Sequence, residues 1–355
     1  MALSYRLGGQ DGVSVEAKKW EWALHTLGFE VRRVAGEFDT AREPGDTRLP
    51  FLAIDPPADA RPNVEALTVA LADADLVVVE NLCSLPLNLA GARAATEALT
   101  RFSGRVVFHH HDLPWERAEF AHIDDFPPNL PGSLHVAISE QARRELSRRG
   151  FDTVMLRNVF EPDPPGGDRD GTRRRLGFMD QDLVILQPTR AIARKEVGRG
   201  LRLAEQIAGL MPDRTVRFWL TGAAEDGYGP TLDELWAAAR VPVTHRGVRD
   251  VADAYAAADL VVMPSSWEGF GNPVIEAMVA ERPVAAAQYP VLAELQDLGL
   301  MVLPLEDPSC VASSLIRPDL EWLHRNHDVV RRELSVGELP GRLLDAFARV
   351  GWADW

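Results

Sequence analysis

The stretch ADLVVMPSSWEGFGNPVIEAMVAERPVAAA, residues 258–287, predicts one strand–helix–strand unit. Leu260–Met263 is a short apolar run, typical of a buried parallel strand. A Gly-rich turn follows, and Pro273 begins a predicted helix to Ala280 at a position where its missing N–H costs nothing. Pro283–Ala287 is the second predicted strand. The pattern indicates an α/β architecture with a parallel sheet.

This unit carries two carboxylates eight residues apart, Glu268 in the turn and Glu276 in the helix. A helix N-terminus beside loop amides suits phosphate or sugar oxygens. A carboxylate in such a loop, like that of Glu268, can accept hydrogen bonds from two neighbouring sugar hydroxyls. A carboxylate about one helical turn into the helix, like that of Glu276, can accept from the two hydroxyls of a ribose. The spacing fits equally well a capping Glu followed by a solvated helix Glu, so both interpretations remain open.

The full string resembles the E-x7-E signature of retaining GT-B glycosyltransferases, in particular glycosyltransferase family 4. The usual wording there is near PSxxEGFGLPxxEAMAxGxPV, and this chain departs from it at Asn272, Glu281 and Arg282. The resemblance implies that Glu268 contacts the donor sugar and Glu276 the donor ribose. It also assigns to the donor site the turn residues Gly269, Phe270, Gly271 and Asn272.

The resemblance implies a GT-B fold: two facing Rossmann-like domains, a central cleft, and a C-terminal helix that crosses back to the N-terminal domain. The Pro- and Gly-rich segment 162–171 is the strongest linker signal in the chain. We therefore expect an N-terminal acceptor-binding domain over 1–163, completed by a helix at about 338–355, and a nucleotide-sugar-binding domain over 170–335. Trp352 and Trp355 are expected to anchor the last helix.

The length, net charge and composition of the chain exclude several classes of function. The chain has 355 residues, enough for two domains, and a net charge of −15, which argues against nucleic acid and against attachment to anionic lipid. No apolar run reaches membrane-spanning length and no signal peptide is evident, so we expect a cytoplasmic protein without stable membrane association. Cys83 and Cys310 have no metal-binding spacing, which fits a reducing compartment.

The N-terminal segment predicts at most a very short strand, then the Gly8-Gly9 turn, where the backbone can approach a ligand closely. The resemblance places Gly8 and Gly9 near the donor phosphates and the acceptor. Trp20 and Trp22 are predicted to pack in the core rather than dock to a membrane. Apolar spacing then predicts a helix over Val13–Leu27 and a strand over Phe29–Val34.

Polar side chains follow the predicted strand Leu76–Val79. Ligands of open α/β sheets bind off the carboxyl ends of strands, so these side chains are candidate acceptor contacts. An ordinary loop with capping Asx residues is an equally good interpretation. The candidates are Glu80, Asn81, Ser84 and Asn88.

A second predicted strand begins at Val106 and ends in three consecutive histidines. Alternation puts His109 and His111 on one face and His110 on the other. No fourth ligand is evident, so no metal site is predicted. The family has a strand ending in "HD", which implies that His111 lies close to the reacting sugar, with His109 as the fallback. The further acceptor candidates here are His109, Asp112 and Trp115, of which Trp115 fits either a sugar face or simple packing.

Two cations follow the predicted strand Leu183–Leu186, namely Arg190 and Lys195. A departing diphosphate needs fixed positive charge, which Arg supplies as a fork and Lys as a point charge. The family carries an Arg and a Lys at this five-residue offset, on the donor diphosphate. Arg194 is a second candidate for the contact with the diphosphate. The alternative is that these cations form a solvated basic turn without a ligand.

The segment 243–251 resembles the part of the family that holds the donor base, which implies base contacts at Gly247 and Val248. After Ala287 the family usually has a Gly-Gly loop, whereas this chain has Gln288, Tyr289 and Pro290.

The function implied is retaining, metal-independent transfer of a hexose-type sugar from a UDP-, GDP- or ADP-linked donor to a small soluble acceptor, with no cofactor. His111, Glu268, Arg190 and Lys195 are the implied catalytic residues. The alternatives are a nucleotide-sugar epimerase or another GT-B enzyme, and a non-catalytic nucleotide-sugar-binding protein.

Overall fold

The computed structural model describes residues 1–9 and 11–352, which divide into two compact units. Unit 1 comprises Met1–Val159 and Val336–Trp355, and unit 2 comprises Phe160–Ser335. The division therefore falls just before the Pro- and Gly-rich segment 162–171, which lies at the start of unit 2. In the described part of the chain, no helix has the length and apolar character needed to cross a membrane.

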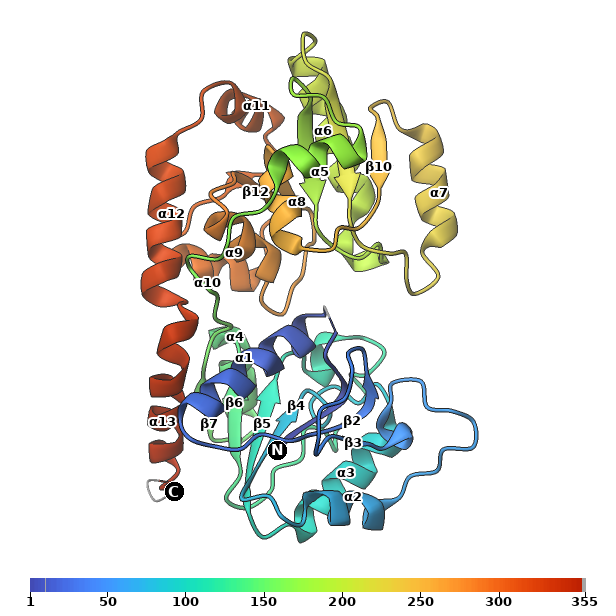
Figure 1. The fold of residues 1–355 in the computed structure, drawn as a ribbon, viewed down its shortest axis with the longest axis vertical. Helices are drawn as coiled ribbons and strands as arrows, with labels where there is room; N and C mark the ends of the chain where they lie inside the picture. Colours follow the sequence, from blue (N-terminus) through green and yellow to red (C-terminus); the bar gives the residue numbers. More distant parts are fainter. Residues whose placement is uncertain (10, 353–355) are drawn as a thin grey trace. The chain divides into compact units, whose positions relative to one another are not determined.

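Unit 1 contains a seven-stranded parallel sheet of order β3-β2-β1-β4-β5-β6-β7 (Figure 1). The C-terminal helix α13 belongs to this unit and packs against α1. The strands are β1 (Ala2–Leu7), β2 (Arg33–Phe38), β3 (Thr47–Arg48), β4 (Leu76–Glu80), β5 (Arg105–His110), β6 (Leu134–Ala137) and β7 (Thr153–Met155). The α-helices are α1 (Gly12–Thr26), α2 (Val64–Leu71), α3 (Leu89–Arg101), α4 (Glu140–Arg148) and α13 (Leu339–Arg349).

Both faces of this sheet are covered, and the alternation along β4 shows how. Val77 and Val79 point into a core shared with α2 and α3, whereas Val78 points into a second core shared with α1 and α13. A strand buried on both faces needs a continuous apolar run, which explains the sequence LVVV at 76–79.

Unit 2 contains a six-stranded parallel sheet of order β10-β9-β8-β11-β12-β13 (Figure 1). The strands are β8 (Leu183–Gln187), β9 (Val216–Leu220), β10 (Val243–His245), β11 (Leu260–Met263), β12 (Val284–Ala286) and β13 (Leu303–Pro304). The helices are α5 (Arg169–Leu176), α6 (Val197–Leu210), α7 (Gly229–Ala238), α8 (Val251–Ala257), α9 (Asn272–Val279), α10 (Pro290–Asp297), α11 (Pro308–Ile316) and α12 (Leu320–Glu333).

Each sheet reverses its strand order once, between β1 and β4 in unit 1 and between β8 and β11 in unit 2. Ligands of doubly wound sheets bind at such switch points, off the carboxyl ends of the strands. The segments that follow β1, β4, β8 and β11 are therefore where a site is expected in each unit.

Two predicted strands near the N-terminus were placed wrongly. β1 has six residues rather than being very short, because its polar side chains find buried partners: Ser4 Oγ donates to the Glu80 carbonyl. β2 begins at Arg33, whereas the prediction was Phe29–Val34. Phe29 and Val31 are apolar because they pack against the α1–α13 core from a non-strand segment.

The two tryptophans of α1 differ. Trp20 is 3% exposed, as predicted, but Trp22 is 44% exposed, so its predicted core position is wrong. Two residues along a helix amount to about 200° of rotation, which puts the two rings on opposite faces. At the C-terminus, Trp352 is buried beside Phe347, and Trp355 lies outside the described residues.

Candidate functional site

The switch point of unit 2 holds a buried ion pair between Lys195 and Glu268. Lys195 follows β8 and Glu268 follows β11, and Lys195 Nζ lies 2.5 and 2.6 Å from the two Glu268 carboxylate oxygens. Burial lowers the pKa of Lys195, and the Glu268 charge only partly offsets this. The sequence predicted both residues, and the structure brings them into direct contact.

The arginines of this segment are placed differently from one another. Arg194 Nη1 lies 3.4 Å from Glu268 Oε2, beside the ion pair. Arg190, the predicted diphosphate ligand, is bonded to Glu225 at 2.8 Å, and both of these side chains are 43% exposed. Arg190 is close enough for its charge to add to the effect of burial in lowering the pKa of Lys195. The structure thus joins Arg194, rather than Arg190, to the Lys195–Glu268 pair.

Three helices of unit 2 begin at this edge of the sheet without a side-chain cap. They are α6 after β8, α9 after β11 and α10 after β12, and none of their cap residues donates or accepts a capping bond through its side chain. An uncapped N-terminus leaves backbone N–H groups and the positive end of the helix dipole available to an anion. This edge is therefore suited to phosphate oxygens.

Glu276 on α9 is held by a tyrosine that the sequence did not single out for this purpose. The Tyr255 hydroxyl donates to Glu276 Oε2 at 2.6 Å, and burial, followed by the charge of Glu276, raises the pKa of Tyr255 well above its usual value. The hydroxyl therefore stays protonated as a donor and fixes one carboxylate oxygen. The predicted base contacts Gly247 and Val248 lie in the segment after β10, where Gly247 is exposed.

The turn between β11 and α9 is shaped by Gly271, whose φ of +96° is a conformation that residues with a side chain rarely adopt. Phe270 is buried and stacks on Phe160 at 6.2 Å, so its role is packing as well as any donor contact. Gly269 and Asn272 are half-buried. An added Cβ at Gly271 would lie only 2.1 Å from the hydroxyl oxygen of Tyr289, a residue for which the sequence predicted no role at the site.

In unit 1, Glu80, His109 and His111 form one cluster at the ends of β4 and β5. Glu80 Oε2 lies 2.8 Å from His109 Nδ1 and 3.0 Å from His111 Nε2. Burial alone would raise the pKa of Glu80, but the two histidines hold it at about 2, so the group is a carboxylate. His109 and His111 share a face, as the alternation predicted. Ligand atoms of the three residues lie within 4.8 Å of one another, a spacing that could hold a metal ion.

The polar groups predicted to contact an acceptor are instead largely bonded to the protein. Asn81, at φ +59°, accepts the His111 and Asp112 backbone N–H groups at 3.1 Å each, so it shapes the turn that presents His111. Asn88 caps α3 and donates to the Phe51 and Ala53 carbonyls at 2.9 and 2.7 Å. Sequence could not distinguish such caps from ligand contacts.

Two further acceptor candidates lie on the loop after β5. Asp112 pairs with Arg117 at 3.1 Å. The Trp115 ring is covered by the Arg149 guanidinium at 3.8 Å, which favours the packing interpretation over an open sugar face.

The Gly8-Gly9 turn after β1 has acidic neighbours. An added Cβ at Gly9 would lie 2.5 Å from Asp39 Oδ2 and 2.8 Å from Asp11 Oδ2, while Arg6 pairs with both carboxylates. The space that a side chain at Gly9 would need is occupied by the carboxylates of Asp11 and Asp39. These two negative charges are unfavourable neighbours for a phosphate.

His110 points to the other face of the sheet and belongs to a buried chain of hydrogen bonds. Ser84 Oγ lies 2.6 Å from His110 Nδ1, His110 Nε2 lies 3.0 Å from His135 Nδ1, and His135 Nε2 lies 3.2 Å from Ser133 Oγ. Ser133 donates to the Leu130 carbonyl at 2.8 Å, so every donor in the chain is fixed and both imidazoles are neutral. Burial lowers the pKa of His135 to about 4.

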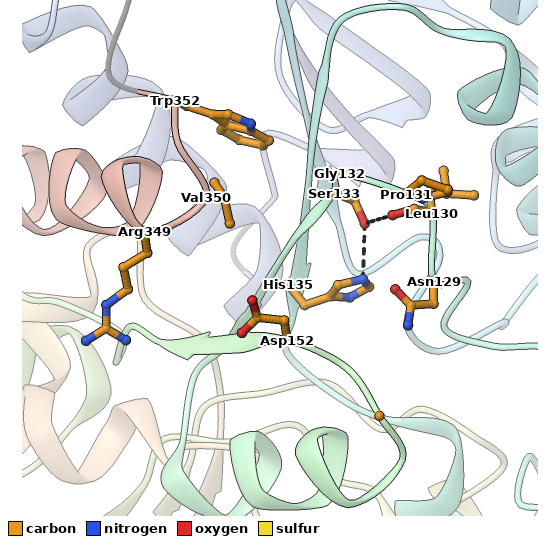
Figure 2. A pocket seen from close by; sticks show the side chains of 11 residues that line it. Asn129, Leu130, Pro131, Gly132, Ser133, His135, Asp152, Arg349, Val350 and Trp352 are labelled. Carbon is orange, nitrogen blue, oxygen red and sulfur yellow. Dashed lines mark hydrogen bonds between the residues drawn. The ribbon is translucent and has the colours of Figure 1, made fainter.

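Figure 2 shows the hollow beside this chain, a pocket of about 510 Å³ that Ser133, His135 and Asp152 line together with Arg349 and Trp352. Ser133 and Asp152 directly precede β6 and β7, so the hollow lies at the amino ends of these strands. It is at the opposite edge of the sheet from Glu80 and is separate from the predicted site.

Residues 191–317 match the family model described as "Glycosyl transferases group 1". The mannosylglucosylglycerate synthase of Thermotoga maritima is 29% identical over 94% of this chain and 90% of its own length. The enzyme of the same name from Petrotoga mobilis is 26% identical over 85% of each chain.

Solved structures share the fold over almost the whole chain. Anabaena HepE in complex with UDP and glucose has a TM-score of 0.72 at 17% identity, covering 98% of this chain and all of that one. Sucrose-phosphate synthase from Thermosynechococcus elongatus has a TM-score of 0.72 at 18% identity, covering 99% of both chains. The predicted GT-B fold is confirmed by these structures, and the predicted enzyme class, a glycosyltransferase, by the family match and the curated relatives.

Proposed function

We propose that this chain is a retaining glycosyltransferase that moves a hexose-type sugar from a nucleotide-diphosphate sugar to a hydroxyl or amine of a small soluble acceptor, without a metal ion. The observation that carries the proposal is the unit 2 edge, where the Lys195–Glu268 pair lies among three helix N-termini that lack side-chain caps. Such an edge has the charge and the free N–H groups that a diphosphate needs.

Within unit 2 the proposed roles follow from chemistry. Lys195 and Arg190 stabilise the negative charge that develops on the departing diphosphate, and no metal ion is needed for that step. Glu268 accepts hydrogen bonds from the sugar hydroxyls, and Glu276, oriented by Tyr255, accepts from the ribose. The backbone near Gly247 and Val248 holds the base.

Unit 1 is proposed to bind the acceptor and to orient the sugar through His111. The Glu80 carboxylate fixes His111 through its Nε2 atom, which accounts for a rigid imidazole at the end of β5. Glu80, Asn81 and His109 act in this proposal by shaping the His111 turn, while Gly8 and Gly9 bring the backbone of the β1 turn close to the acceptor.

The relatives that span most of the chain support a choice of acceptor. Both are named mannosylglucosylglycerate synthases, and a glycerate carries a carboxylate and free hydroxyls. We propose glucosylglycerate, with nucleotide-linked mannose as donor, as the first substrate pair for this chain.

The test is a transfer assay with UDP-, GDP- and ADP-linked mannose and glucose, with glucosylglycerate as acceptor, in the presence of EDTA. A product whose new glycosidic bond keeps the donor's anomeric configuration, read by NMR, supports the proposal. An inverted bond would exclude a retaining mechanism, and activity lost with EDTA would return Glu80, His109 and His111 to consideration as metal ligands. A second nucleotide sugar formed without any acceptor, with one sugar carbon inverted, would favour an epimerase.

A further inference from the structure

The hydroxyl of Tyr289 is buried without a partner at the unit 2 edge. Tyr289 lies directly after β12, at the start of α10, and its residue is 4% exposed. Its hydroxyl oxygen is buried and has no hydrogen-bond partner among the residues that the structure describes. Buried polar groups in folded proteins are nearly always paired, so this exception requires an explanation.

The other two buried tyrosines show what is normal in this chain. Tyr5 donates to the Leu82 carbonyl at 2.9 Å and lies equally close to the Leu85 carbonyl. Tyr255 donates to Glu276 at 2.6 Å. Tyr289 therefore differs from both in having a hydroxyl that no described group satisfies, and a bound molecule is the natural source of its partner.

The surroundings of this hydroxyl indicate the chemistry of a group that could bond to it. An added Cβ at Gly271 would lie 2.1 Å from the Tyr289 oxygen, so the hydroxyl lies against the turn that carries Glu268. Burial raises the pKa of Tyr289, and the charge of Glu268 raises it further, so the phenol stays protonated beside that carboxylate. A protonated phenol and a carboxylate that border the same turn suit a group that can donate and accept at once.

A sugar hydroxyl is such a group. The Glu268 carboxylate can only accept hydrogen bonds, whereas the phenol can also donate one. One hydroxyl can therefore donate to Glu268, which Lys195 already pairs, and accept from Tyr289. A sugar that lacks this hydroxyl would leave the Tyr289 oxygen without a partner. Sites built in this way discriminate strongly against the deoxy analogue.

We propose that Tyr289 is a specificity-determining contact of this chain, whose hydroxyl bonds a hydroxyl of the donor sugar beside Glu268. The inference rests on the proposed function and deepens it, because it assigns a sugar-reading residue to the donor site. If this hydrogen bond forms only with the sugar, the Tyr289 oxygen contributes to the binding of the sugar and not to the stability of the free protein.

The experiment compares Tyr289→Phe with Tyr5→Phe as the matched control, since each change removes one buried phenol oxygen. Calorimetry gives the dissociation constants of the nucleotide sugar used in the transfer assay and of its nucleoside diphosphate, and thermal unfolding gives Tm. For Tyr289→Phe we expect about tenfold weaker binding of the nucleotide sugar, unchanged binding of the nucleoside diphosphate, and an unchanged or raised Tm. Tyr5→Phe should lower Tm and leave both affinities unchanged.

Two results would overturn the inference. The first is nucleotide-sugar affinity in Tyr289→Phe equal to wild type while the wild type transfers sugar, which leaves the proposed function intact. The second is an equal loss of affinity for both ligands together with a lower Tm, which would make the hydroxyl structural. If the wild-type protein transfers no sugar and does not bind the nucleotide sugar, the proposed function fails together with the inference.

Discussion

The two sheets of this protein have the same parallel architecture, but the helices that begin at and beside their switch points start in opposite ways, although α8 and α11 of unit 2 are capped by Asp250 and Asp307. In unit 1, the helices after β1, β4 and β6 start with the side-chain caps Asp11, Asn88 and Ser139. In unit 2, the helices after β8, β11 and β12 start with none. The hydroxyls of Ser265 and Tyr289 at that edge also lack a partner within the described part of the chain.

The comparison supports the proposal that the unit 2 edge binds an anionic ligand. Each capping side chain accepts from one free N–H group of its helix, so a capped edge depends less on an anion for its stability. An edge left uncapped gives up that stability and regains it when a ligand supplies the missing partners. The unit 2 edge is of the second kind, and the predictions below test this contrast.

The largest effect is expected at Glu268. Replacing Glu268 with Gln keeps its size but removes the charge that pairs with Lys195 and accepts from the sugar. We expect kcat/KM to fall by about 10²–10³-fold, with binding of the free nucleoside diphosphate retained. Glu205→Gln, which disrupts the Glu205–Arg240 pair of the same unit, is the control and should leave the rate unchanged. Near-wild-type transfer by Glu268→Gln would contradict the assignment.

The arginines provide the next contrast. Arg190→Ala should lower kcat/KM by about 10²-fold if its guanidinium leaves Glu225 for the diphosphate. Arg194→Ala should cost less than about tenfold, because Arg194 contacts Glu268 only at 3.4 Å. The measurement is kcat/KM of both variants. A larger loss for Arg194→Ala than for Arg190→Ala would assign the contact with the diphosphate to Arg194.

At the capped edge the effect should appear in stability and not in binding. Asn88→Ala removes the α3 cap and two bonds to carbonyls, so we expect a loss of about 2–3 kcal/mol in the free energy of unfolding. Urea denaturation measures this loss, while nucleotide affinity should stay at the wild-type value. Weakened nucleotide binding with normal stability would mean that unit 1 is also a ligand edge.

The His110–His135 pair predicts a pH effect of similar or smaller size. Burial lowers the pKa of His135 to about 4, so the unfolded chain, with a pKa near 6.5, binds more protons as pH falls. The contribution of His135 to the free energy of unfolding is largest above about pH 6.5 and is smaller by about 2 kcal/mol at pH 5.

Other groups titrate in the same range, since burial raises the pKa of Glu21 and of Glu116 to about 7 and so acts in the opposite direction. The measurement is therefore a difference: the stability lost between pH 7 and pH 5 should be about 2 kcal/mol greater in wild type than in His135→Phe. Phe can keep the ring contact with Phe108. Equal pH dependence in the two proteins would refute the neutral histidine pair.

The sequence predicted the elements that carry strong local signals and missed those that depend on tertiary contacts. β11 was predicted at its exact bounds because a continuous apolar run is typical of a buried strand. β2 was displaced because the apolar residues Phe29 and Val31 pack against a core without being in a strand. The spacing of apolar residues does not distinguish a buried strand from an apolar segment that packs against the core without forming a strand.

At the site, residues with a spaced motif were predicted and residues with only a spatial relation were not. Glu268 and Lys195 come from segments 73 positions apart in the sequence, and their contact follows from the β8–β11 switch point. The roles of Tyr255 and Tyr289 depend on where each hydroxyl points, which sequence does not contain. The only signal was the replacement of a usual Gly-Gly loop by Gln288, Tyr289 and Pro290.

The most direct test of the central claim is a thermal-shift titration of the wild-type protein with UDP, GDP, ADP and dTDP, each with and without EDTA, alongside Lys195→Met. The account predicts that one nucleotide raises Tm, that EDTA does not change this shift, and that Lys195→Met largely removes it. No shift with any nucleotide would contradict the claim that the unit 2 edge is a diphosphate site, and a shift abolished by EDTA would contradict its independence of metal ions.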